Sequence, residues 1–257
     1  MLKTWLQHPL TRGLDIDDPQ TTNLRRQIIT EKPFLRQLYQ EWYASIATAL
    51  PPPPGAVLEL GSGAGFLSET LPDLIASDIL ACPHIDAVLD GHALPVGASS
   101  LRAIVMTDVF HHLAQPRRFL AEAARCVRPG GAIVLVEPWV TPWSRLIYTR
   151  LHHEPFNPDT TGWEFPPSGP LSGANIALPW IIFHRDRDRL RAEFPEWRID
   201  AITPTMPLCY LLSGGVSLRS LMPGWSFGLW RWAEGVLKPW MDDVAMFARI
   251  VLIRVDP

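Results

Sequence analysis

The chain has few cysteines, no surplus of basic residues and few charges, and each shortage excludes a class of protein. Its three cysteines, Cys82, Cys126 and Cys209, stand far apart and form no CxxC pair, so the sequence predicts neither a disulfide framework nor a zinc site. Lys and Arg number 23 against 26 Asp and Glu. Without a basic excess to displace the counterions of a nucleic acid, a role in coating DNA or RNA is excluded. Charged residues are only 19% of the 257, which predicts some apolar surface.

No segment predicts a secretion signal or a membrane-spanning helix. Residues 1–9 lack the apolar core of a signal peptide, and no run reaches the length of about 18 apolar residues that spans a bilayer. The uncharged stretch 201–218 is interrupted by Pro204, Pro207 and the pair Gly214 and Gly215. We therefore expect a cytoplasmic protein, with peripheral contact to the inner face of a membrane as an open alternative.

Tryptophan is absent from residues 57–138 and abundant after them. Nine of the 11 tryptophans lie at or beyond Trp139. Indole combines a large apolar surface with one polar edge, so the C-terminal part carries amphipathic aromatic surface. The sequence predicts a single domain over 1–257, with a helical cap over 1–54, a core over 55–138, and a substrate-side region over 139–257 that contains an aromatic insertion near 207–240.

Short apolar runs alternate with helical segments through the core. The runs occupy 56–60, 74–79, 85–89, 102–109 and 132–136, and strands that alternate with helices form a mostly parallel sheet flanked by helices. Two later runs, 198–203 and 246–255, bring the expected strands to seven, with the last two as an antiparallel edge pair. Apolar spacing over 33–50 predicts an amphipathic helix before the sheet, and residues 128–131 predict a helix stop followed by a turn.

A glycine-rich loop follows the first apolar run. The stretch Glu59-Leu60-Gly61-Ser62-Gly63-Ala64-Gly65 has no Cβ atom at three positions, so its backbone can approach a ligand closely and offer N–H groups to it. A dinucleotide-binding loop needs glycine at position 66, where this chain has Phe66, and a phosphate-binding loop needs a Gly-Lys pair that is absent. Nicotinamide-dependent oxidoreductases are therefore disfavoured.

In this loop and in three later blocks the chain resembles the class I S-adenosylmethionine-dependent methyltransferases. The blocks, 57–66, 88–95, 104–113 and 125–131, follow one another in the order of that family. The resemblance covers about 56–138. It implies an α/β, Rossmann-like fold, methyl transfer as the reaction and S-adenosylmethionine as the cofactor.

The resemblance and the chemistry of the cofactor give the first candidate residues their roles. Glu59 is expected near the ammonium group. The loop residues that face the methionyl and ribose parts are Gly61, Ser62, Gly63 and Gly65. Asp78, at the end of the second apolar run, is expected to accept both ribose hydroxyls. It follows Gly61 by 78 − 61 = 17 positions, fewer than the usual spacing of about 20, so the intervening helix must be short.

Residues of the later blocks complete the expected cofactor site. Asp90 would accept from the adenine amino group, while the backbone of Gly91 and His92 reaches the ring. Thr107 and Asp108, at the end of the fourth apolar run, would close the methionyl end near the transferable methyl group.

Two histidine pairs carry further candidate chemistry. His111 and His112 are the candidate catalytic residues, as a general base or a wall of the methionyl site; the alternative is one packed and one solvent-facing histidine. His152, His153 and Glu154, with Glu137 upstream, are metal-ligand types. Because no third ligand occurs at a fixed spacing, a surface or substrate-loop role is favoured and no metal is expected.

The C-terminal insertion bears on the acceptor. Trp225, Leu229, Trp232 and Val236 fall on one helical face, which either inserts at a membrane interface, lines a pocket for a hydrophobic acceptor or packs over the sheet. We expect residues 207–240, with Tyr39 and Tyr43, to cover the cofactor cleft. The expected function is methyl transfer to a small-molecule, lipid or glycan-linked acceptor; the alternative is an S-adenosylmethionine-binding or membrane-associated scaffold without chemistry.

Overall fold

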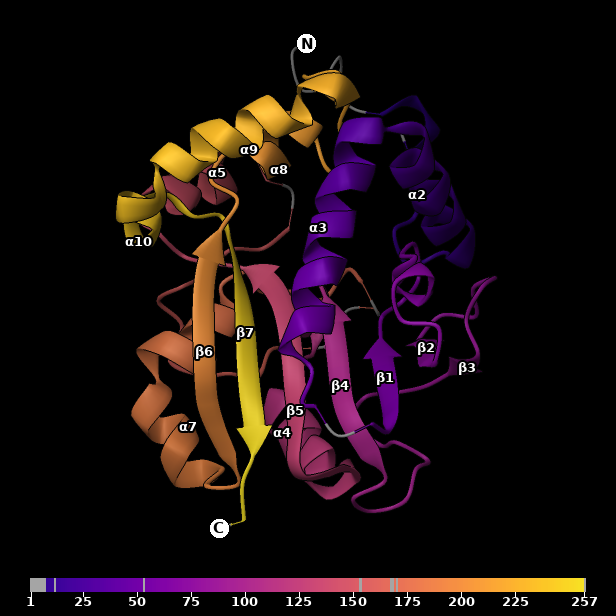
Figure 1. Cartoon of the computed structure of the whole chain (residues 1–257), viewed down its shortest axis with the longest axis vertical. Coiled ribbons are helices and arrows are strands. Elements are labelled where there is room, and N and C mark those ends of the chain that lie inside the picture. Colours follow the sequence, from indigo (N-terminus) through magenta and orange to yellow (C-terminus); the bar gives the residue numbers. More distant parts are fainter. Residues whose placement is uncertain are drawn as a thin grey trace.

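A seven-stranded sheet in the order β3-β2-β1-β4-β5-β7-β6 forms the centre of the molecule (Figure 1). The structure is a computed structural model that describes residues 8–11, 13–52, 54–152, 154–166, 169 and 171–256. The strands are β1 (Ala56–Leu60), β2 (Leu74–Asp78), β3 (Ala87–Val88), β4 (Leu101–Thr107), β5 (Val127–Pro138), β6 (Trp197–Thr205) and β7 (Phe247–Arg254). Strands β1 to β5 are parallel, and β7 is antiparallel to both β5 and β6. The expected Rossmann-like α/β fold with an antiparallel edge pair is confirmed.

Helices cover both faces of this sheet. One face carries α4 (Pro116–Cys126), α6 (Leu178–Trp180), the π-helical η4 (Ile181–Arg185) and α7 (Arg187–Glu193). The other carries α2 (Pro19–Glu31) and α3 (Pro33–Ala49), and α5 (Pro142–Arg150), α8 (Cys209–Ser213) and α9 (Phe227–Val236) extend the same core at the carboxyl end of the sheet. The remaining short elements are η1 (Pro9–Thr11), η2 (Leu67–Glu69), η3 (Phe110–His112), η5 (Gly224–Ser226), η6 (Lys238–Trp240) and α10 (Met241–Val244).

Alternating side chains of the central strands build two separate cores. Met106 of β4 packs in the core that includes Phe119 of α4, and its neighbour Val105 packs in the core that includes Trp42 of α3. Successive residues of a strand point to opposite faces, so helices on both sides are needed to bury them. Water is therefore excluded from both faces of β4, and polar side chains that could take part in a reaction lie at the ends of the strands.

Two local features differ from the sequence prediction. Residues 128–131 lie inside β5, so the predicted turn is wrong: α4 ends at Cys126 and the strand begins at once. The extra residues are taken up as an irregularity, because the pairing changes from Leu101 opposite Val127 to Ala103 opposite Ala132. After the glycine loop only the 3-10 turn η2 forms, which agrees with the short spacing before Asp78.

The C-terminal insertion lies at the end of the sheet where the parallel strands finish. Figure 1 shows α9 beyond the carboxyl ends of β5 and β6, across the top of the molecule. In the part of the chain that the structure describes, no helix combines the length and the apolar character needed to cross a bilayer.

Candidate active site

A cavity of about 1000 Å³ opens at the carboxyl ends of β1, β2 and β4. Ligands of open α/β sheets bind at this edge, where the strand order reverses. The volume is at the upper end of the range of about 300–1000 Å³ for small-molecule pockets. The cavity therefore has room for a cofactor and an acceptor together.

The glycine loop after β1 packs tightly against its own protein. Gly61 has a φ of +73°, a backbone conformation that L side chains rarely adopt. A Cβ on Gly63 would lie 2.9 Å from both Asp78 Oδ2 and Thr22 Cγ2. The N–H of Gly63 donates to Asp78 Oδ2 over 3.0 Å. This N–H, expected to face a ligand, instead holds the Asp78 carboxylate at the cavity wall.

Two buried carboxylates lie beneath the loop. Glu59 accepts a 2.6 Å hydrogen bond from Ser62 Oγ, and burial raises the pKa of Glu59 to about 7. Asp78 also accepts from the N–H of Leu80 over 2.8 Å, and burial raises its pKa above the ordinary value. Both residues line the cavity beside the loop, as the sequence predicts.

Asp90 and His92 form a joined unit farther along the cavity. Asp90 Oδ1 accepts from the backbone N–H of His92 over 2.9 Å and lies 2.7 Å from His92 Nδ1. The backbone N–H of His92, expected at the adenine ring, is thus taken by Asp90. The imidazole Nε2 of His92 is buried with no hydrogen-bond partner. Gly91 lies against Leu60, which leaves little room for a larger residue.

Two buried polar atoms on residues that line the cavity have no protein partner in the described structure. They are His92 Nε2 and Thr107 Oγ1, and the hydroxyl of Thr22 lies in the same cavity wall. Buried polar groups are almost always hydrogen-bonded, so these atoms fit a ligand with several polar groups. S-adenosylmethionine, with its ribose, adenine and methionyl groups, is a ligand of this kind. Thr22 was not predicted, because a threonine in an N-terminal helix carries no motif.

Glu137, at the end of β5, organises the loop that follows β4. Its carboxylate is fully buried, and Oε1 accepts from the backbone N–H groups of Val109 (2.8 Å) and Phe110 (2.7 Å). The second oxygen, Oε2, lies 2.8 Å from His111 Nδ1. The loop begins at Asp108, which has a φ of +61° and whose pKa is raised to about 7 by burial.

His111 and His112 occupy different environments. His111 is 1% exposed, and the carboxylates of Glu137 and Glu154 raise its pKa well above the ordinary value, overcoming the opposite effect of burial. His112 lines the cavity, and burial together with the charge of His111 lowers its pKa to about 4. The pair is thus one packed and one cavity-facing histidine, rather than one facing open solvent.

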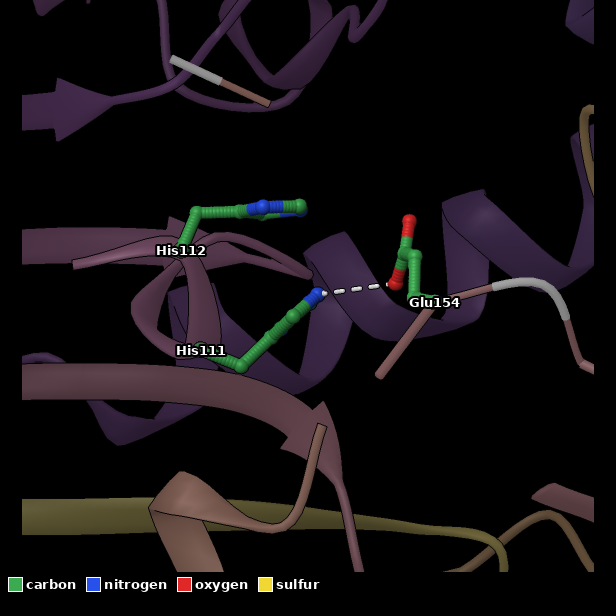
Figure 2. Close-up of side chains that lie close together, drawn as sticks. All are labelled: His111, His112 and Glu154. Atoms are coloured by element: carbon green, nitrogen blue, oxygen red, sulfur yellow. Dashed lines mark ion pairs between the residues drawn. The ribbon is translucent and has the colours of Figure 1, made fainter. Parts of the chain in front are cut away.

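Glu154 joins this cluster from the segment after α5. Its Oε2 lies 3.4 Å from His111 Nε2, and Figure 2 marks this ion pair with a dashed line. Sequence spacing carried no signal for this arrangement, because Glu137 and Glu154 follow His111 by 26 and 43 positions. The pairing of Thr107 with Val136 brings Glu137 beside the loop. His153 lies outside the described residues.

The insertion covers the cavity only with its first half. Tyr210, Leu211 and residues 214–219 line the cavity together with Tyr39 and Tyr43 of α3, whereas α9 does not. Lys32, between α2 and α3, fixes this part of the insertion: its Nζ donates to the carbonyls of Gly215 (2.5 Å) and Leu218 (2.8 Å). The first half of the insertion, and not α9, therefore lines the cavity.

Comparison with known proteins assigns the chain to a family. A family profile described as "Methyltransferase domain" matches residues 34–204, which is more than half of the chain. The chain belongs to the class I S-adenosylmethionine-dependent methyltransferases. The match begins in α3 and includes every strand from β1 to β5, so it contains the whole glycine-loop edge of the cavity.

Individual relatives of this methyltransferase are more distant. Demethylmenaquinone methyltransferases of Renibacterium salmoninarum and Paenarthrobacter aurescens are 29% and 31% identical, over 43% and 37% of this chain. These alignments cover 54% and 44% of the relatives, so the chain spans about half the length of the curated relatives it matches. Geranyl diphosphate C-methyltransferase from Streptomyces coelicolor A3(2) has the same fold, with a TM-score of 0.54, 14% identity, and coverage of 97% of this chain and 92% of that one.

Replacement of Glu137 tests whether this carboxylate holds the loop together. Glu137→Ala leaves the N–H groups of Val109 and Phe110 and the ring of His111 without their buried acceptor. We expect the free energy of unfolding to fall by about 3–5 kcal/mol in urea denaturation. The control is Glu164→Ala, which removes an exposed carboxylate paired with Arg117 and should cost about 1 kcal/mol or less. Equal effects of the two substitutions would contradict the role given to Glu137.

Proposed function

We propose that this methyltransferase transfers the methyl group of S-adenosylmethionine to a small acceptor with a long apolar part. The observation that carries this proposal is the composition of the cavity away from the glycine loop. That wall is aromatic and aliphatic, with Tyr39, Ile147, Tyr148, Leu151, Tyr210, Leu211, Val216, Leu218, Leu221, Met246 and Phe247. The relatives' names specify demethylmenaquinone and geranyl diphosphate, both of which carry prenyl groups, and this supports an acceptor of the same class.

In this proposal the cofactor lies along the loop Gly61–Gly65, with Glu59 at its ammonium group and Asp78 at the ribose. Asp90, Gly91 and His92 surround the adenine, and the unpartnered His92 Nε2, whose ring donates from Nδ1 to Asp90, accepts a hydrogen bond from the ligand. Thr107 and Asp108 close the methionyl end. This places the methyl group on the side of the cavity that His112 and Glu154 share.

The chemistry then depends mainly on alignment. The sulfonium of S-adenosylmethionine is already a strong electrophile, so holding the acceptor in line and excluding water supply much of the acceleration. His112 and Glu154 are among the cavity-lining polar groups beside the proposed methyl position, together with Asp108. His111, which does not line the cavity, is a positioning residue held by Glu137.

Acceptor chain length provides the direct test of this function. We expect kcat/KM for a series of hydroquinones to rise with each added prenyl unit, because more apolar surface leaves water for the aromatic wall. Formation of S-adenosylhomocysteine measures the rate. Val216→Asp, which places a charge on that wall, should remove the dependence on chain length without changing the affinity for S-adenosylmethionine. A rate independent of chain length, or highest for acceptors without a chain, would contradict the proposal.

The buried carboxylate of Glu59 predicts a pH dependence of cofactor binding. Glu59 must be ionised to pair with the ammonium group, and its pKa in the free protein is about 7. Below that pH a proton has to leave before the cofactor binds, so the affinity should fall by up to about tenfold per pH unit from pH 7 to pH 5. Isothermal titration calorimetry measures it. Glu59→Gln should bind weakly with no such slope, and a flat profile in the unmodified protein would contradict the assignment.

Helix α9 supports delivery of the acceptor from a membrane. The buried side of the helix carries Phe227, which packs on Phe34, and Glu234, which accepts from the N–H groups of Leu208 (2.7 Å) and Cys209 (2.6 Å). Arg231 pairs with Glu41 of α3. The outer side is apolar and exposed: Trp232 is 70% exposed, and Trp225 of the preceding turn η5 is 84% exposed. The alternative that these tryptophans pack over the sheet is therefore wrong.

These exposed apolar side chains on and beside α9 lead us to include peripheral membrane contact in the proposal. Leu229, Val236 and Trp240 continue the exposed row, each more than half exposed. Tryptophan and aliphatic side chains together are typical of helices that lie in the bilayer interface. Leu221, 49% exposed, lines the cavity and lies just before η5, so the row begins close to the cavity.

Vesicle binding tests this contact. The double substitution Trp225→Ser and Trp232→Ser should reduce partitioning onto phosphatidylcholine–phosphatidylglycerol vesicles by about tenfold or more, because each indole can bury about 100 Å². The stability should change by about 0.5 kcal/mol or less per substitution, since both side chains are exposed. The control, Val88→Ser, removes an apolar side chain that is 55% exposed at the far edge of the sheet and should leave both properties unchanged. A large loss of stability, or unaltered vesicle binding, would contradict the proposal.

A further inference from the structure

Three ligand-type side chains converge at the wall of the cavity. His111 and His112 come from η3, and Glu154 from the segment after α5 (Figure 2). One donor atom of each lies within 4.8 Å of the others. Figure 2 shows the far ends of both imidazole rings directed toward the Glu154 carboxylate. The cluster thus brings two nitrogen donors and one oxygen donor to one place.

The Nδ1 atom of each imidazole ring already has a hydrogen-bond partner. His112 Nδ1 lies 3.1 Å from the carbonyl oxygen of Gly173. A carbonyl only accepts, so this ring nitrogen carries the proton and Nε2 keeps its lone pair. His111 Nδ1 lies 2.8 Å from Glu137 Oε2, which likewise leaves Nε2 for another partner when the ring is neutral. Histidine ligands of metal ions are oriented in this way, by a carboxylate or carbonyl on the far nitrogen.

The distance within the cluster suits a shared ion better than direct contact. Charge-assisted N–H···O bonds are about 2.7–2.9 Å long, and His111 Nε2 is 3.4 Å from Glu154 Oε2. Two ligands on a tetrahedral zinc ion, each at about 2.0–2.1 Å, are about 3.4 Å apart.

We propose that His111, His112 and Glu154 bind one divalent ion of the zinc type, and Zn²⁺ is the ion that we expect. Two imidazoles and one carboxylate favour such an ion over Mg²⁺, which prefers oxygen ligands. Three protein ligands leave a fourth position open, and His112 and Glu154 line the cavity, so that position faces the acceptor. Its ligand is an oxygen of the acceptor, such as a hydroxyl, whose proton passes to solvent when the oxygen binds the ion.

Metal binding by the full-length chain is the first test. After treatment with EDTA and dialysis, titration calorimetry with ZnCl₂ should show a single site per chain, and MgCl₂ should bind far more weakly. His112→Ala and Glu154→Gln should each lower the zinc affinity by about 100-fold or more, and Glu137→Gln by roughly 10–100-fold. The matched control is His184→Ala, which removes an exposed histidine outside the cavity and should bind zinc unchanged.

Zinc-edge X-ray absorption of the unmodified protein gives a second readout that needs no variant. The proposal predicts two imidazole nitrogens and oxygen ligands, and a shell of oxygen alone or of thiolates would overturn it. No zinc binding, or unaltered binding in His112→Ala and Glu154→Gln, would overturn it as well. Circular dichroism verifies that each variant is folded.

The role of the ion toward the acceptor rests on the proposed function, and the same samples separate the two. Zinc binding without any binding of S-adenosylmethionine would contradict the proposed function and leave the metal site standing. Methyl transfer to the prenylated hydroquinones that proceeds equally fast in EDTA-treated and zinc-loaded protein would overturn the inference about the ion and leave the proposed function standing.

Discussion

The buried carboxylate of Glu137 is the interaction on which the reactive edge of this protein depends. Its two oxygens take the backbone N–H groups of Val109 and Phe110 and the ring of His111. A loop that leaves the end of a buried strand has backbone donors that neither the sheet nor water can satisfy. Glu137 satisfies them from the neighbouring strand, and in doing so fixes the loop from Asp108 to His112 at the cavity.

The loop after β4 also contacts the glycine loop after β1. β4 lies between β1 and β5, so the glycine loop after β1 and the Glu137-held loop after β4 enclose one space. A Cβ on Gly61 would collide with Val109. The two loops therefore pack directly on each other, and a shift of the loop held by Glu137 would also displace the glycine loop.

The outer part of the insertion follows a different rule. Most surface helices expose their charged side chains, whereas α9 buries Glu234 beside Phe227 and exposes Trp232, next to the exposed Trp225 of η5. Burying a carboxylate costs free energy unless it is hydrogen-bonded, and here the N–H groups of Leu208 and Cys209 meet that requirement. Glu234 and the buried Phe227 hold the helix in place while its outer apolar side chains stay exposed.

Local sequence was sufficient for much of this fold and for part of the site. That the glycine loop, Asp78, Asp90 and Thr107 lie at one cavity was predictable, because each ends or follows an apolar run that becomes a strand, and parallel strands end at one edge. The cluster of His111, Glu137 and Glu154 was not, since it depends on the pairing of β4 with β5 and on the path of the chain after α5. The exposed face of α9 was also undecided, because helical periodicity shows which residues share a face but not which face is buried.

A crystal structure of the protein with S-adenosylhomocysteine bound is the measurement that tests the account most directly. The account predicts that the ligand lies along Gly61–Gly65, that Thr107 Oγ1 and His92 Nε2 gain hydrogen-bond partners, and that the ligand's sulfur faces the side of the cavity bounded by His112 and Glu154. A ligand bound elsewhere, or one whose sulfur points away from that side, would contradict it.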